Sequence, residues 1–191
     1  MDVIVLNGAS SSGKSSIASA LQDLLPEYYL HVGIDTFIDM MPRKSNLLES
    51  SDLTADGFYF ATINIQGNDI RRIKSGDYGK KVNRAYHSTV RHFVDSGLKV
   101  IVDDVMNGLT EQVEWKEVLR GRNVLFVGVQ CSTEILIERE SRRSDRMQGS
   151  ALEQANRVHS EVSYDLVVST TSNSALDCAN EIIEHITITG C

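Results

Sequence analysis

The chain has 191 residues, of which 41% are hydrophobic and 24% charged, a composition typical of one globular domain rather than a disordered or membrane protein. Its net charge of −7 argues against a nucleic-acid-binding surface, because phosphate backbones select for clustered Lys and Arg. The three cysteines, Cys131, Cys178 and Cys191, are odd in number and widely spaced, so we expect reduced thiols. Since no apolar run is long enough for a signal peptide or a bilayer span, we expect a cytoplasmic protein without a membrane partner.

Short apolar and β-branched runs alternate with stretches of helical period along the chain. The predicted strands lie at residues 3–7, 29–34, 99–102, 124–129 and 166–168. The clearest predicted helices lie at residues 14–25, 82–94 and 175–186. The run at 99–102 shows no alternation, which indicates burial on both faces of a sheet. This order predicts an α/β fold, in which a five-stranded parallel sheet carries helices on both faces, in one domain over residues 1–191.

Residues 8–15 read G-A-S-S-S-G-K-S and match the phosphate-binding pattern G-x-x-x-x-G-K-[ST] at every specified position. The motif follows an apolar strand and opens a helix, which is the arrangement that the chemistry needs. Small residues let backbone N–H groups face phosphate oxygens, and the helix N-terminus adds partial positive charge. The predicted nucleotide-binding residues here are Gly8, Ala9, Ser10, Ser11, Ser12, Gly13, Lys14, Ser15 and Ser16. The alternative, a Gly/Ser loop that only turns the chain, is disfavoured by the flanking strand and helix. We therefore predict the three-layer sandwich of P-loop NTPases.

Two adjacent acids end the third predicted strand, where they would meet a metal ion bound with the phosphates. Lys14 is expected to bridge the β- and γ-phosphates, and the Ser15 hydroxyl to bind Mg²⁺. Asp103 is the favoured acidic metal residue, because it follows the hydrophobic run directly; Asp104 either shares that role or orients a neighbour or the substrate. An exposed acidic turn is the alternative. The predicted metal residues are thus Ser15, Asp103 and Asp104.

Asp35 follows the second predicted strand directly and precedes an expected helix at residues 36–41. In open α/β sheets the carboxyl ends of the strands face the ligand. An acid there can accept the proton of an attacking hydroxyl, as in kinases. The spacing leaves a second interpretation open, in which Asp35 is only the N-cap of the helix.

Four arginines, Arg139, Arg142, Arg143 and Arg146, lie close together after the fourth predicted strand. Guanidinium groups stabilise the charge of a transferring phosphoryl group, so residues 139–150 are predicted to form a lid over the triphosphate. The alternative is a solvated helix with mixed charges. Residues 43–77, rich in Ser, Gly and Asn, are predicted to be a long irregular insertion on the acceptor side, or else a plain surface loop.

Several segments in order resemble the chloramphenicol phosphotransferase family of small P-loop kinases. They are I-V-L-N-G before S-G-K-S, G-I-D-T at residues 33–36, I-V-D-D-V at 101–105, V-G-V-Q-C at 127–131, and R-E with Arg143 and Asp145-Arg146. The resemblance runs over nearly the whole chain, whereas residues 43–77 match the family poorly. It implies phosphorylation of the primary hydroxyl of chloramphenicol, with Asp35 as the base. It also places Arg139, Arg143 and Arg146 on family-like positions and the loop with Thr170 and Thr171 beside the adenine.

The sequence therefore predicts an ATP- and Mg²⁺-dependent O-phosphotransferase with catalytic residues Asp35, Lys14, Arg139, Arg143 and Arg146. The expected partner is a small hydroxylated molecule, such as an antibiotic, rather than nucleic acid or membrane. A homo-oligomer is left open. Two alternatives remain open. One is a metabolic small-molecule or nucleotide kinase of the shikimate type. The other is a nucleotide-dependent switch that signals through a partner and has no small acceptor.

Overall fold

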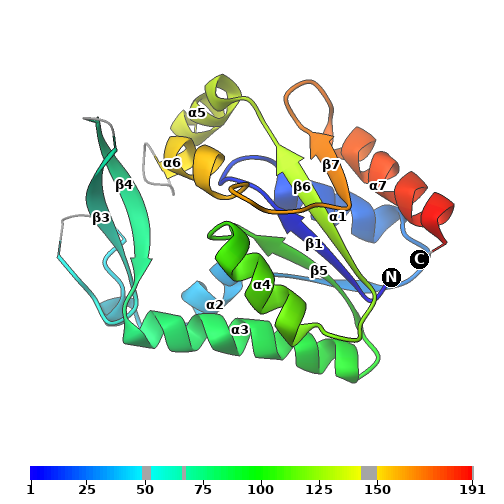
Figure 1. Ribbon diagram of the computed structural model, residues 1–191, viewed down its shortest axis with the longest axis horizontal. Helices are drawn as coiled ribbons and strands as arrows, with labels where there is room; N and C mark the ends of the chain where they lie inside the picture. The colour runs from blue at the N-terminus through cyan, green and yellow to red at the C-terminus, as the bar shows by residue number, and fades with distance from the viewer. Residues whose placement is uncertain (49–52, 66–67, 143–149, 191) are drawn as a thin grey trace.

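The computed structural model describes residues 1–48, 53–65, 68–142 and 150–190. Its centre is a five-stranded parallel sheet in the order β2-β5-β1-β6-β7 (Figure 1). These strands are β1 (Val3–Asn7), β2 (Tyr29–Gly33), β5 (Lys99–Asp104), β6 (Val124–Gln130) and β7 (Leu166–Ser169). The helices are α1 (Lys14–Leu24), α2 (Ile34–Asp39), α3 (Asp77–Asp95), α4 (Leu109–Val118), α5 (Thr133–Ser141), α6 (Ser150–Arg157) and α7 (Ala175–Thr189), with a 3-10 turn at Arg43–Ser45. The predicted fold class and sheet are confirmed.

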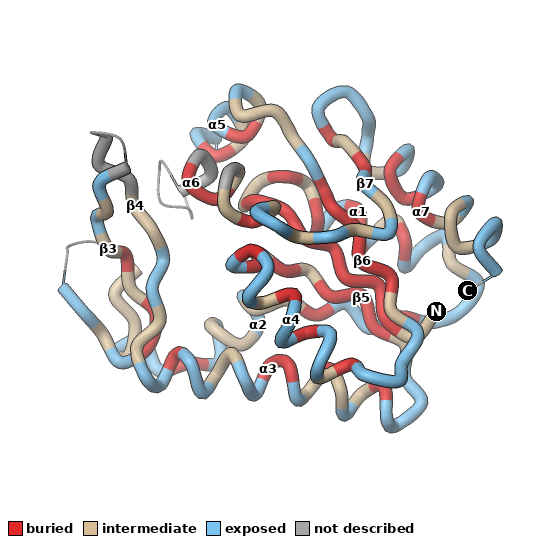
Figure 2. The backbone as a smooth tube through the Cα atoms, viewed as in Figure 1, coloured by how far each residue is buried: buried red, intermediate tan, exposed pale blue. Residues whose placement is uncertain are grey.

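Two hydrophobic clusters sandwich the sheet, and the alternation of side chains along β1 separates them. Ile4 and Leu6 pack with the apolar faces of α1 and α7, while Val3 and Val5 pack against α3 and α4 on the other face. All four side chains are buried, as the red central strands in Figure 2 show. Burying such a side chain contributes about 1.5–3 kcal/mol. β1 thus anchors the sheet, and the phosphate-binding loop that follows it starts from a rigid strand.

The region at residues 43–77 differs from the prediction, because its second half contains an antiparallel hairpin of β3 (Phe58–Ile65) and β4 (Asn68–Ser75). The Ser, Gly and Asn residues that suggested an irregular loop lie largely around the strands. Within β3, the sequence F-Y-F-A-T-I-N-I is rich in aromatic and β-branched residues, which favour a strand, and Phe58 and Phe60 are buried. The hairpin contacts α6 through β4 and forms a separate layer beside the main sheet (Figure 1).

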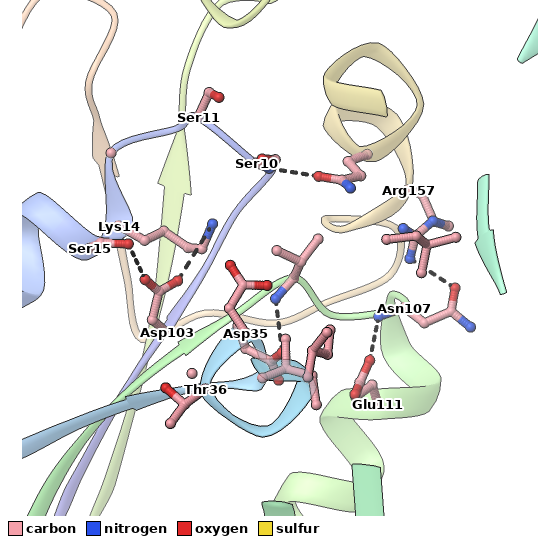
Figure 3. A pocket seen from close by; sticks show the side chains of 18 of the residues that line it. Ser10, Ser11, Lys14, Ser15, Asp35, Thr36, Asp103, Asn107, Glu111 and Arg157 are labelled. Atoms are coloured by element: carbon pink, nitrogen blue, oxygen red, sulfur yellow. Dashed lines mark hydrogen bonds and ion pairs between the residues drawn. The ribbon is translucent and has the colours of Figure 1, made fainter. Parts of the chain in front are cut away.

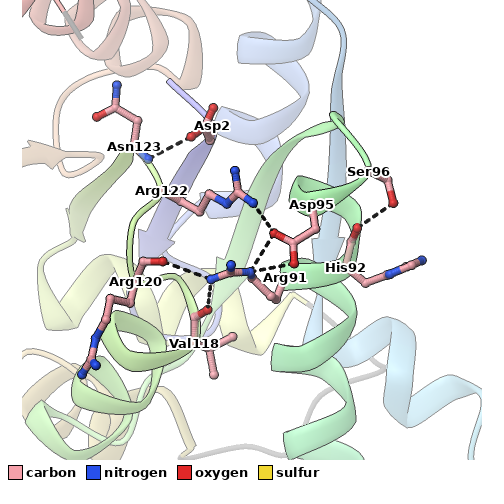
Figure 4. A network of polar contacts seen from close by, with 9 residues as sticks. All are labelled: Asp2, Arg91, His92, Asp95, Ser96, Val118, Arg120, Arg122 and Asn123. Atoms are coloured by element: carbon pink, nitrogen blue, oxygen red, sulfur yellow. Dashed lines mark hydrogen bonds and ion pairs between the residues drawn. The ribbon is translucent and has the colours of Figure 1, made fainter.

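A polar network closes the end of the molecule where β1 and β6 begin (Figure 4). The Arg91 guanidinium donates to the Asp95 carboxylate and to the carbonyl oxygens of Val118 and Arg120, and Arg122 also donates to Asp95. These hydrogen bonds join α3 to the turn after α4. The Asn123 N–H donates to Asp2 and joins the segments that precede β6 and β1, so the network lies at the opposite end of the sheet from the carboxyl ends of the strands. No helix among the described residues has the length and apolarity that a membrane crossing requires.

Candidate active site

A cleft of about 900 Å³ opens at the carboxyl ends of β1, β2 and β5. Such crevices are where open α/β sheets bind ligands. The loop between β1 and α1 lines one end of it, and the β3–β4 hairpin with α3 and α6 lines the other. We call these the donor end and the acceptor end. Figure 3 shows Asp35 between them, with Lys14 and Asp103 on one side and Asn107 and Arg157 on the other.

The donor end has the backbone shape of a phosphate cradle. Gly13 has a φ of 93° and Ser11 a φ of 65°, so the loop turns through left-handed conformations directly before α1. A Cβ on Gly8 would lie 2.5 Å from the Val129 carbonyl oxygen, so this position requires glycine. The Oγ atoms of Ser11 and Ser12 are buried and have no hydrogen-bond partner in the described part of the chain. These unpartnered donors and the turned backbone fit a bound triphosphate.

Lys14 and Ser15 meet Asp103 in the floor of the donor end. The Ser15 hydroxyl donates to Asp103 Oδ2 at 2.5 Å, and Lys14 Nζ lies 3.7 Å from Asp103 Oδ1 while donating to the Ala9 carbonyl oxygen at 2.9 Å. Burial works to raise the pKa of Asp103, but the Lys14 ammonium and the hydrogen bonds from His31 and Ser15 lower it to about 2. Asp103 is therefore an ionised carboxylate beside a hydroxyl, and this donor set fits Mg²⁺.

Asp104 lies on the opposite face of β5 from Asp103, because neighbouring residues of a strand point in opposite directions. It accepts hydrogen bonds from Trp115 Nε1 at 2.6 Å and from its neighbour's backbone N–H at 2.9 Å. Burial, and then the nearby Glu111 charge, raise the pKa of Asp104 to about 7. Asp103 thus lies at the phosphate cradle, whereas Asp104 lines the cleft from the other face of β5 and is held by Trp115 of α4. Asp104 instead lies with His87 and Glu111, whose possible ligand atoms all lie within 4.8 Å of one another, so its metal role beside the phosphates stays a prediction.

Asp35 lies in the first turn of α2 and lines the cleft. The helix begins two residues earlier than expected, and its N-cap is Gly33 rather than Asp35. A Cβ at Gly33 would lie 2.9 Å from the Asp103 carbonyl oxygen, so the chain passes close to β5 just before the acid. The N-cap interpretation of Asp35 is therefore wrong, and the residue stands at the cleft between the donor and acceptor ends (Figure 3).

Arg139 braces the cradle from α5. Its guanidinium donates to the carbonyl oxygens of Thr170 at 3.0 Å and Ser11 at 3.4 Å, while the Thr170 hydroxyl donates to the Ser12 carbonyl oxygen at 2.7 Å. Thr171 lies next along, where its hydroxyl oxygen accepts from the Ser132 N–H. These contacts set the outer shape of the loop that holds Ser10, Ser11 and Ser12.

The other predicted arginines give less information. Arg143 and Arg146, with most of the predicted lid at residues 139–150, lie outside the described residues. Arg142 is exposed and pairs with Glu138 one turn away on α5, which fits the alternative of a solvated helix with mixed charges. Ser16 lines the cleft after Ser15.

Several polar residues at both ends of the cleft were not predicted from the sequence. Arg72 on β4 and Arg157 on α6 both line the cleft and both contact Glu153, and Gln154 accepts from the Ser10 N–H at 2.7 Å. His31 Nε2 lies 3.6 Å from Asp103. Only the Glu153–Arg157 spacing of four residues on a helix gave a signal in the sequence. The other pairs join residues too distant along the chain for any motif to show.

A parallel sheet in this order, a phosphate cradle after its central strand and an ionised acid at the end of the neighbouring strand define a P-loop phosphotransferase. Comparison with known proteins agrees. The chain belongs to the chloramphenicol phosphotransferase-like protein family, whose profile matches residues 1–187.

Two curated relatives come from Mycobacterium tuberculosis strains, and each carries the name "Putative O-phosphotransferase". Each is 32% identical over 194 residues, covering 95% of this chain and 80% of the relative.

The similar solved structures show the same fold. A sugar kinase from Janibacter sp. superposes with a TM-score of 0.65 at 16% identity, covering 98% of this chain and 95% of that one. A gluconokinase from Sinorhizobium meliloti has a TM-score of 0.59 at 17% identity, covering 98% of this chain and 92% of that one. A shikimate kinase from Acinetobacter baumannii has a TM-score of 0.56 at 15% identity, covering 99% of this chain and 94% of that one. With the family, these findings make the protein a kinase-type enzyme that acts on a hydroxyl.

Proposed function

We propose that the protein transfers the γ-phosphoryl group of ATP to a hydroxyl of a small molecule. The observation that carries this proposal is one cleft in which the Lys14–Ser15–Asp103 group and Asp35 face the same space. A cradle alone would bind a nucleotide. A second acid between that cradle and an acceptor-sized space adds what transfer to a hydroxyl needs.

Lys14 is released from the Ala9 carbonyl oxygen when phosphate oxygens compete for it, because an ammonium has three donors and prefers charged acceptors. The Ser15 hydroxyl and Asp103 would hold Mg²⁺, which neutralises phosphate charge. Turned backbone N–H groups from Ser10 to Ser15 bind the phosphate oxygens.

Asp35 orients the acceptor hydroxyl and receives its proton. The hydroxyl oxygen forms a bond to the γ-phosphorus, the bond from that phosphorus to the β–γ bridging oxygen breaks, and ADP leaves with the bond's electron pair. Arg139, Arg143 and Arg146 are proposed to neutralise the spreading charge, with residues 139–150 excluding water from the cleft. Arg139 lines the cleft and contacts the cradle at the Ser11 carbonyl oxygen, which supports its part in this role.

Chloramphenicol is the first acceptor to test, at its primary 3-hydroxyl, because the family is named for that activity. A metabolic kinase of the shikimate or gluconate type is the second candidate, since proteins of those names share the fold. A nucleotide-dependent switch without an acceptor is disfavoured by Asp35 in the cleft.

The deciding experiment incubates the protein with Mg·ATP and a panel of hydroxylated antibiotics, sugars, sugar acids and nucleosides, and measures product mass. We expect the mass of one acceptor class to rise by about 80 Da, the net gain when a phosphoryl group replaces the hydroxyl proton. Slow ATP hydrolysis with no phosphorylated product from any acceptor would contradict the proposal.

A further inference from the structure

The acceptor end of the cleft contains two guanidinium groups held on one carboxylate. Glu153 of α6 is 2% exposed, and its Oε1 accepts from Arg72 Nε at 2.5 Å and from Arg157 Nε at 2.8 Å. Arg157 also donates through Nη1 to Asn107 Oδ1 at 3.0 Å and to the Met106 carbonyl oxygen at 3.2 Å. The hairpin, α6 and the loop after β5 therefore meet at this one group.

The charges of this group do not cancel, because two cations share one anion. Each guanidinium has five N–H donors. Arg157 uses Nε and Nη1 on Glu153, Asn107 and Met106, which leaves Nη2 for a ligand, and among the described residues Arg72 donates only through Nε. Arg72 is 29% exposed and Arg157 16%, and both line the cleft. Half-buried guanidinium groups in a fixed position are suited to bind a carboxylate or phosphate with paired hydrogen bonds.

The surrounding residues add positive charge on the hairpin side. Lys74 follows Arg72 by two residues on β4 and so lies on the same face of the hairpin, and Lys80 reaches the cleft from α3. The negative groups that line this end are Asp104 of β5 and Glu111 and Glu114 of α4, and Lys80 pairs with Asp77 at 3.3 Å. Glu111 is occupied by hydrogen bonds from the Asn83 side chain and the Asn107 N–H, which hold it against α3. The positive side chains of this end thus gather on β4 and α6, whereas its acids lie on β5 and α4, and two guanidinium groups on one side of the cleft are suited to an anionic group.

We propose that Arg72 and Arg157 form an anion subsite that binds a carboxylate or phosphate group of the acceptor. This proposal rests on the proposed function, because that function makes the bound anion part of the acceptor. Asp35 lies between the phosphate cradle and Arg157, so an acceptor anchored by its anionic group presents a hydroxyl to Asp35 (Figure 3). The nucleotide has its own arginine in Arg139, which contacts the cradle directly. The natural acceptor is then a hydroxylated acid or phosphate ester rather than a neutral alcohol such as chloramphenicol.

Binding is measured by calorimetry on the full chain saturated with Mg·ADP, so that anions cannot occupy the phosphate cradle. The probes are matched pairs: gluconate with sorbitol, glycerate with glycerol, and glycerol 3-phosphate with glycerol, with chloramphenicol as a further neutral probe. We expect at least one acid or phosphate to bind about tenfold or more tightly than its neutral partner, because only the anion can form charge-assisted paired hydrogen bonds with a guanidinium. The carboxylate and phosphate arms identify which anion fits. No preference for the anionic member in any pair overturns the subsite.

Arg72→Ala and Arg157→Ala are each expected to remove most of that preference, while Arg72→Lys keeps part of it because the charge stays and the planar fork is lost. Arg120→Ala is the matched control, since Arg120 is an exposed arginine that pairs with Glu117 outside the cleft. Circular dichroism and thermal melting identify any variant that fails to fold, and Arg72→Lys then carries the test. Variants that lose affinity for ATP relative to ADP, with the anion preference intact, would assign the arginines to the γ-phosphate and overturn the proposal.

Product formation separates this inference from the proposed function. Transfer to chloramphenicol with no transfer to any acid or phosphate would keep the phosphotransferase and overturn the anion subsite. Arginine-dependent anion binding with no phosphorylated product from any probe or panel compound would keep the subsite and overturn the assignment of the occupant as an acceptor.

Discussion

The donor and acceptor ends of the cleft differ in how far apart in the sequence their residues lie. Most of the donor end comes from eight consecutive residues, to which β5 adds Asp103. The acceptor end joins Arg72 to Glu153, which are 81 residues apart, through a hairpin that lies outside the main sheet. A local motif fixes its own geometry, whereas a site made by distant elements depends on how they pack. Changes at the donor end should therefore affect every acceptor, and changes at the acceptor end should affect only some.

The largest effect is expected from Lys14→Ala. The variant loses the ammonium that neutralises phosphate charge, so kcat should fall by about 100-fold or more with any acceptor. The measurement is steady-state ADP release with two unrelated acceptors. Lys116→Ala, an exposed lysine of α4, is the control. A fall confined to one acceptor would contradict the division into two ends.

Asp35→Asn is expected to lower kcat by about 10²–10⁴-fold, because the amide cannot take the hydroxyl proton. Nucleotide affinity, measured with a fluorescent ATP analogue, should be unchanged. Asp39→Asn alters an exposed acid of the same short helix and should behave as wild type. Wild-type transfer rates in Asp35→Asn would remove Asp35 from the mechanism.

Gly8→Ala tests the rigidity of the donor end. The added methyl group would lie 2.5 Å from the Val129 carbonyl oxygen and 2.7 Å from Ser12 Oγ, so the loop must shift. We expect a loss of about 1–3 kcal/mol in the free energy of unfolding, together with weaker nucleotide binding. Gly97→Ala serves as the comparison, because its methyl group meets open space and only its φ of 83° is strained. Equal nucleotide affinity in both variants would show that the loop tolerates the shift.

The smallest effect concerns Asp104 and the pH dependence of stability. Its pKa of about 7 lies above the ordinary 3.8, so the folded protein binds this proton more tightly than the unfolded chain does. Protonated Asp104 stabilises the folded protein fully below the pKa of this carboxyl in the unfolded chain, and this stabilisation is lost as the pH rises through about 7. In metal-free buffer, Asp104→Asn should flatten the decline in melting temperature between the ordinary pKa of 3.8 and about pH 7. Glu111 also faces this group, but its lowered pKa gives a dependence of opposite sign, so an unchanged slope in Asp104→Asn would contradict the role of Asp104.

The sequence predicted the features that depend on neighbouring residues. The phosphate cradle, the buried strands and the position of Asp35 after β2 each follow from a short stretch of chain. The roles of Asp103 and Asp104 stayed open, because the sequence does not say which face of β5 meets α1. The hairpin was missed because Ser, Gly and Asn around it outweighed the strand pattern of residues 58–65. Arg157 is marked only by its helical spacing from Glu153, and Arg72 gave no signal, because only the folded chain brings both arginines to the same carboxylate.

The two consecutive acids that end β5 have a consequence for how this protein can change over generations. Asp103 is ionised beside the phosphate cradle and Asp104 is buried beneath Trp115, and the pleat of one strand keeps them apart. Losing or gaining a single residue between Lys99 and Asp103 would exchange their faces, putting the wrong acid in each place. Substitutions in this segment can be tolerated one at a time, while a change in its length cannot. The number of residues in β5 before Asp103 is therefore constrained, whichever apolar side chains occupy the strand.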